Sequence, residues 1–239
     1  MFYVFSLKKL RVISLTVLLF ALITAIIVGG SYRWGSVAVS GRKTLPEPVL
    51  IIDPGHGGLD GGAVGVDGTV EAAINLELSL RLYDLSRFFG VRAAITRDSE
   101  EIDYPEDITG TAKKKAWDQK TRVDFINSFD NAVLISIHQN KFPDPRPWGP
   151  QVLYGNGEAS EMFGKAVHEA VNAQLSPENR RVASKISDKI YLMRSVKCPA
   201  ILVECGFVSN SGELGKLKNE DYQKEFALIL AASYLRFGF

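Results

Sequence analysis

Three short runs of apolar, often β-branched residues most constrain the fold of this chain, because each ends in an ionisable side chain. The runs are 49–53, 132–138 and 200–204, and they end in Asp53, His138 and Glu204. Apolar runs of this length are typical of strands buried on both faces of a parallel sheet. Side chains at the carboxyl ends of such strands, next to glycine-rich loops, form the sites of α/β folds.

Helical patterns separate these predicted strands. Four segments show the apolar spacing of helices: 71–89, 114–129, 158–175 and 221–237. Three further stretches suit short strands: 91–97, 151–154 and 190–193. Strands that alternate with helices predict an α/β fold, in which a central, mostly parallel or mixed sheet is flanked by helices.

The N-terminal part of the chain differs in composition from the rest. Residues 12–29 contain no charged side chain, and Lys8, Lys9 and Arg11 precede them. This pattern is typical of an export signal or a signal anchor, and its length is close to the about 20 residues of a spanning helix. We expect residues 1–30 to be a signal peptide or a signal-anchor helix, cleaved or retained in the membrane. Residues 31–48 would be a linker and 49–239 one domain outside the cytoplasm.

Charge and cysteine content exclude some classes of function. The formal net charge is +1 and no basic stripe follows a helix, which argues against a nucleic-acid partner. Cys198 and Cys205 lie at the two ends of one apolar run. If that run is extended, their Cα atoms are separated by more than the about 7 Å that a disulfide allows. We expect two free, largely buried thiols.

Two histidines and a glutamate suggest a metal site. His56 lies in the glycine-rich loop after the first strand, His138 ends the third, and Glu71 begins the first helix. Zinc accepts these ligand types, and a catalytic zinc keeps one position open for water. Glu204 could then act as general acid and base, or it could form a buried salt bridge.

The spacing of other polar residues along the predicted helices and strands predicts where their side chains lie. Asn75 follows Glu71 by one helical turn and would point toward the same pocket. Asn140 would share the face of His138 if the strand continues. Both suit substrate binding or support of the ligands. Arg122 could contact a peptide carboxylate, although a surface position is expected, and His168 is expected on the surface.

Four ordered motifs resemble the zinc-dependent N-acetylmuramoyl-L-alanine amidases of bacterial cell-wall metabolism. They are Asp-Pro-Gly-His-Gly-Gly at 53–58, Gly-Ala-x-Gly-x-x-Gly-x-x-Glu-x-x-x-Asn at 62–75, Ser-Ile-His-x-Asn at 136–140 and Val-Glu-x-Gly-Phe-x-Ser-Asn at 203–210. The resemblance implies a mixed six-stranded sheet, peptidoglycan as substrate, and one zinc ion per chain. Its ligands would be His56, Glu71 and His138, with Glu204 as the catalytic acid and base.

The short length and the apolar N-terminal segment are most similar to the germination-specific, spore-cortex branch of this family. That likeness implies removal of stem peptides on the way to muramic-δ-lactam, together with a peptidoglycan deacetylase, and a lipoprotein that supports activity. Gln139 stands where many relatives carry alanine, and we expect it to contact none of the proposed metal ligands. The alternatives are a membrane-anchored peptidoglycan-binding protein with a structural zinc, and a zinc peptidase that cuts within the stem peptide.

Overall fold

Strands and helices alternate along residues 47–239, the part of the chain that the computed structural model describes. The strands are β1 (Val49–Pro54), β2 (Ala93–Ile95), β3 (Ala132–Asn140), β4 (Gln151–Tyr154), β5 (Ser184–Lys185) and β6 (Ala200–Phe207). The helices are α2 (Glu71–Phe88), α3 (Thr111–Asn127), α4 (Glu158–Leu175), α5 (Tyr191–Ser195), α6 (Ser211–Leu217) and α7 (Glu220–Phe237). The predicted signal or anchor segment and nearly all of the linker lie outside the described residues. Between residues 47 and 239, no helix is both long and apolar enough to cross a membrane.

The six strands form one mixed sheet in the order β2-β1-β3-β6-β4-β5. The strands from β2 to β6 in this order run parallel, β4 pairs with β6 antiparallel, and β5 runs parallel to β4. The three apolar runs are therefore neighbours at the centre of the sheet, as their composition predicts. Their carboxyl ends lie at one edge of the sheet, which gathers the polar groups that end them.

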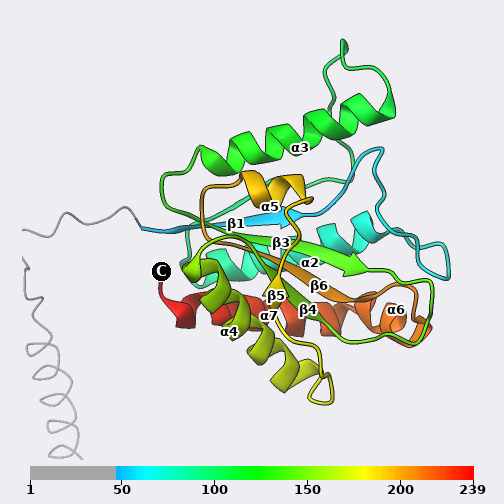
Figure 1. Cartoon of the computed structure of the whole chain (residues 1–239), viewed down its shortest axis with the longest axis vertical. Coiled ribbons are helices and arrows are strands. Elements are labelled where there is room, and N and C mark those ends of the chain that lie inside the picture. The colour runs from blue at the N-terminus through cyan, green and yellow to red at the C-terminus, as the bar shows by residue number, and fades with distance from the viewer. Residues whose placement is uncertain (1–46) are drawn as a thin grey trace, which may run out of the picture. The chain divides into compact units, whose positions relative to one another are not determined.

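Helices cover both faces of the sheet, and the alternation of side chains along the strands supplies both cores (Figure 1). Leu50 and Ile52 of β1 belong to the core beneath α2, α4 and α7. Ile51 belongs to the second core, beneath α3 and α5. The predicted α/β fold with a mixed six-stranded sheet is confirmed.

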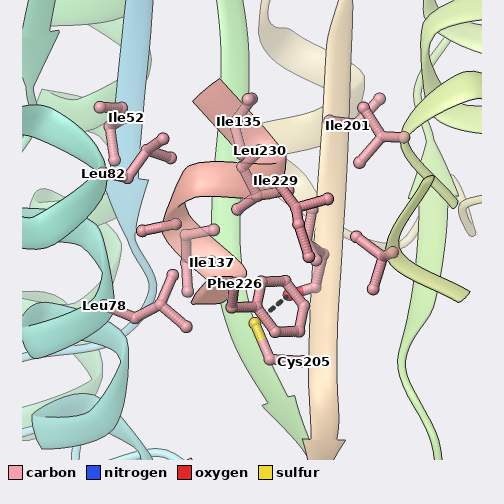
Figure 2. Packing of buried hydrophobic residues seen from close by; sticks show 14 of the residues in the cluster. Ile52, Leu78, Leu82, Ile135, Ile137, Ile201, Cys205, Phe226, Ile229 and Leu230 are labelled. Atoms are coloured by element: carbon pink, nitrogen blue, oxygen red, sulfur yellow. Dashed lines mark hydrogen bonds between the residues drawn. The ribbon is translucent and has the colours of Figure 1, made fainter. Parts of the chain in front are cut away.

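The larger core packs helices α2 and α7 against the central strands (Figure 2). Leu78 of α2, Phe226 of α7 and Ile137 of β3 are fully buried in it. Cys205 lies in the same core, where its thiol donates to the carbonyl of Val203 at 3.7 Å. Both cysteine thiols are free, as expected.

Some elements differ from the sequence prediction. The strand predicted at 190–193 is wrong: Ile190 accepts from Arg194 N and Leu192 from Val196 N, so these residues close a short helix, α5. The last strand of the sheet is β5 instead, whose two residues are too few for a visible period. Helix α6 was not predicted, although Asn210 caps it by accepting from the backbone N–H groups of Gly212 and Glu213.

Candidate metal centre and active site

The first ligand candidate lies in a tight loop where β1 ends. His56 has a φ of 62°, in the left-handed region that side chains with a Cβ rarely adopt. Gly55 before it has no space for a side chain, because a Cβ there would overlap the imidazole of His138. The Pro-Gly-His sequence therefore brings the backbone of the loop directly against the end of β3.

His56, Glu71 and His138 converge on one point. Glu71 Oε1 lies 3.4 Å from His56 Nε2 and 3.0 Å from His138 Nδ1. One ligand atom from each of the three side chains lies within 4.8 Å of the others. Two imidazole nitrogens and a carboxylate form a donor set that fits zinc and leaves room for a further ligand.

Other groups orient these three side chains. Asp60 Oδ2 accepts from His56 Nδ1 at 3.0 Å, which leaves Nε2 free to face Glu71, and Lys115 Nζ lies 2.7 Å from the same carboxylate oxygen. Glu71 Oε2 accepts from the backbone N–H of Ala63 at 2.8 Å. A carboxylate that fixes the orientation of a histidine is a common support of metal ligands.

Asn75 and Gln139 form a second layer behind Glu71. Asn75 Nδ2 donates to Gly55 O at 3.0 Å and to Glu71 Oε1 at 3.3 Å. Gln139 Nε2 donates to Asn75 Oδ1 at 3.1 Å, and its backbone N–H donates to Glu71 Oε1 at 3.0 Å. Asn75 thus points where its spacing predicts. The expectation that Gln139 touches no ligand is wrong, because its backbone holds Glu71.

The network keeps Glu71 ionised. Burial raises the pKa of Glu71, but its hydrogen bonds with His138 and His56 outweigh that cost and hold the pKa well below the ordinary value. Burial lowers the pKa of His56, yet Glu71 and Asp60 raise it above the ordinary value. The cluster is therefore arranged around a net attraction for positive charge.

Glu204 faces the same site from the neighbouring strand, since it pairs with His138 in the register of β3 and β6. Its Oε2 atom is buried and has no hydrogen-bond partner among the described residues. Burial, and to a smaller extent the charge of Glu71, raises the pKa of Glu204 to about 7, although His138 and His56 oppose the shift. A carboxyl group with this pKa can accept and return protons near neutral pH.

A cavity of about 370 Å³ opens onto this cluster. His56, His138 and Glu204 lie in its floor, and Lys189 and Tyr191 from the segment around α5 contribute to its wall. Two of the metal-ligand candidates, His56 and His138, and the carboxyl of Glu204 therefore meet the same open space, as an active site requires.

Three predicted positions are corrected. The surface position expected for Arg122 is wrong: its side chain is buried, pairs with Asp53 and Asp118 at 2.9 Å each, and donates to His56 O at 2.6 Å. His168 is also buried, not on the surface, and it contacts Arg181 O at 2.7 Å. Asn140 ends β3 beyond a register shift and does not line the cavity; its backbone carbonyl accepts from Val208 N at 2.9 Å.

The sequence alone suggests no role for two buried polar residues near the site. Asp53 accepts from Thr96 Oγ1 at 2.7 Å and from Ser136 Oγ at 2.7 Å, besides its pair with Arg122. Burial raises its pKa, but Arg122 and the two hydroxyl groups keep it below the ordinary value. Arg97 lies just past β2 and donates a hydrogen bond to the backbone carbonyl of His56. The signal available for both was a charged residue at the end of an apolar strand.

Fold and site together define an α/β domain with a candidate metal centre beside a buried carboxyl group, and the chain belongs to the N-acetylmuramoyl-L-alanine amidase family. Residues 50–233 match that family. The chain is therefore an amidase that acts on peptidoglycan.

Named relatives place it within the family. It is 34% identical over 208 residues to the germination-specific N-acetylmuramoyl-L-alanine amidase of Bacillus subtilis, which covers 87% of this chain and 84% of that protein. The structure of the CwlD amidase from Clostridioides difficile in complex with the GerS lipoprotein superposes with a TM-score of 0.76 and 31% identity, over 79% of this chain and 97% of that one. The amidase AmiC2 of Nostoc punctiforme gives a TM-score of 0.67 and 25% identity over 79% and 96%.

Proposed function

We propose that this chain is a zinc-dependent amidase that hydrolyses the bond between the lactyl group of N-acetylmuramic acid and L-alanine. One observation carries the proposal: the carboxyl of Glu204, with its raised pKa, lines the same cavity as His56 and His138, on which Glu71 converges. An open metal site beside a proton acceptor is the arrangement that zinc hydrolases use.

Each residue has a role in this proposal. His56, Glu71 and His138 would hold the zinc ion, which when bound supplies a Lewis acid that activates water and polarises the scissile carbonyl. Glu204 removes a proton from the attacking water. It then returns that proton to the nitrogen of the departing L-alanine, so that the amide C–N bond breaks and a carboxylic acid and an amine result.

The surrounding groups fix this geometry before the substrate arrives. Asp60 holds His56 with Nε2 toward the site, while Asn75 and the backbone of Gln139 hold Glu71. Rigid support of this kind lowers the reorganisation needed to reach the transition state. A purely structural zinc site would need closed coordination and no adjacent proton acceptor, so the cavity and Glu204 favour the enzyme over a peptidoglycan-binding protein.

We further propose that the substrate is spore-cortex peptidoglycan, on the way to muramic-δ-lactam and together with a deacetylase. The support is the likeness to the germination-specific relative. The enzyme would act outside the cytoplasmic membrane, exported or anchored by its N-terminal segment. A lipoprotein is proposed as its partner, because the similar CwlD amidase forms a complex with the GerS lipoprotein.

The test is product analysis with the full chain, purified in detergent and incubated with cortex peptidoglycan, with zinc or with a chelator. Free stem peptides that begin at L-alanine, and that disappear on chelation, are expected. Fragments cut inside the stem peptide would instead identify a peptidase. Glu204→Gln should bind zinc and release nothing, whereas the matched control Glu225→Gln, at an exposed site, should retain activity.

If wild-type protein binds zinc but releases no product, adding the candidate lipoprotein separates two explanations. Release that appears only with the lipoprotein would establish an obligatory partner. No release under either condition would contradict the amidase mechanism proposed for Glu204.

A further inference from the structure

The guanidinium group of Arg97 joins the two backbone segments that carry ligand candidates. Its Nε donates to Pro54 O at 3.0 Å and to His56 O at 2.7 Å. Its Nη2 donates to Gly55 O at 3.0 Å and to Ala72 O, in the first turn of α2, at 2.9 Å. One side chain therefore connects the loop after β1 with the start of the helix that carries Glu71.

We infer that Arg97 is a positioning residue that sets the separation of His56 and Glu71 by binding the carbonyl groups on both sides of the site. The inference rests on the proposed zinc site. Arg97 contacts neither ligand side chain, so it would act through the backbone. It would decide how well the two ligands are placed before the metal binds.

The loop is shaped around this guanidinium. His56 is held in the left-handed region, and its carbonyl accepts from Arg97. Gly57 follows with a φ of 130°, and a Cβ there would lie 2.8 Å from Arg97 Nε. A strained residue persists only where its surroundings over-determine it, and here Arg97 supplies part of that constraint.

Arg97 differs from its neighbour Arg122 in what balances its charge. Arg122 also donates to Pro54 O and His56 O, at 2.7 Å and 2.6 Å, but it is paired with Asp53 and Asp118. The hydrogen bonds described for Arg97 go only to backbone carbonyls, the fifth being Ser99 O at 3.0 Å.

Such a charge is costly in a protein interior. Arg97 is 8% exposed, and burial together with the charge of Arg122 lowers its pKa to about 10. A buried guanidinium without a carboxylate partner is a poor means of stabilising a fold. The effect of Arg97 should therefore appear in the site more than in the unfolding free energy.

Lysine cannot replace this arrangement. A guanidinium presents five N–H donors in a planar fork, whereas an ammonium presents three donors on one atom. Two different nitrogens of Arg97 contact Pro54 O and Ala72 O. A single lysine Nζ would not reach both oxygens. Arg97→Lys should therefore keep a cation at the site but lose the link between loop and helix.

The experiment measures zinc affinity and stability separately, using the full chain. Zinc dissociation constants are obtained by competition with a chromophoric chelator, and unfolding of the metal-free protein is followed in urea. Arg97→Lys and Arg97→Met are compared with wild type and with Arg92→Lys, whose exposed side chain donates to Glu47 O at 3.5 Å. We expect zinc binding about 10–100-fold weaker in both Arg97 variants and unchanged in the control.

Each outcome bears on a different statement. Loss of zinc affinity in folded Arg97→Lys, with metal-free unfolding close to wild type, would establish the positioning role; addition of guanidinium ion to Arg97→Met should then restore part of the affinity. Zinc affinity within twofold of wild type in Arg97→Lys would overturn the inference. A fall in the unfolding free energy without a loss of zinc affinity would also overturn the inference. Wild-type protein that binds no zinc would refute the proposed function instead.

Discussion

Replacing Glu204 by glutamine should change how the stability of the metal-free protein depends on pH. The folded protein raises the pKa of this carboxyl from 4.5 to about 7, mainly through burial. In the unfolded chain the group should titrate near 4.5. Between these two values the folded protein retains a proton that the unfolded chain has released.

The sign follows from proton binding. Because the folded state binds more protons in this window, the free energy of unfolding falls as pH rises. The contribution of Glu204 is complete below about pH 4.5 and has been lost once pH exceeds about 7. A difference of about 2.5 pKa units at about 1.4 kcal/mol per unit corresponds to about 3.5 kcal/mol.

Urea unfolding of wild type and Glu204→Gln in a chelator, at pH 5 and pH 8, measures this contribution. Other titrating groups of the site are present in both proteins, so the comparison of the two pH dependences isolates Glu204. From pH 5 to pH 8, wild type should lose about 2–3 kcal/mol more than Glu204→Gln. Equal pH dependences would refute the raised pKa of Glu204 in the metal-free protein.

Three further variants test the site and the core. Gly55→Ala should abolish zinc binding, measured as bound metal per chain, because its methyl group overlaps the imidazole of His138, whereas Gly215→Ala in open space should bind normally. Asp60→Ala removes the acceptor that orients a histidine ligand and should weaken zinc binding about 10–100-fold in chelator competition; an unchanged constant would contradict that role. Leu78→Ala, at a fully buried position, should lower the unfolding free energy by about 2–5 kcal/mol in urea without changing the zinc constant of the folded protein.

The sequence predicted those strands and helices whose pattern of apolar residues is clear. The strands β1, β3 and β6 are apolar on both faces, and α2 starts at Glu71 as its pattern indicates. The convergence of His56, Glu71 and His138 was predictable, because parallel strands in a sheet end at the same edge.

The wrong surface positions of Arg122 and His168 have a common physical origin. Arg122 and His168 belong to helices whose partners are distant in the chain, and sequence spacing does not reveal which face of a helix is covered. A polar residue on a helix is therefore assigned to the surface by default. Both are buried here because their donors are satisfied: those of Arg122 by Asp53 and Asp118 as well as His56 O, and that of His168 by Arg181 O. Backbone acceptors leave no trace in the identity of the residues that provide them.

Several features of the site are unfavourable for the metal-free fold. His56 has a left-handed backbone, and Glu204 keeps a buried oxygen without a hydrogen-bond partner between residues 47 and 239. Glu71 and Glu204 lie close together, and the negative charge of Glu71 opposes the ionisation of Glu204. A divalent cation held by His56, Glu71 and His138 would offset this repulsion and lower the pKa of Glu204, so that the carboxylate becomes the stable form. The same ion that completes the coordination would thus prepare the proton acceptor, which links zinc affinity, stability and catalysis through one electrostatic interaction.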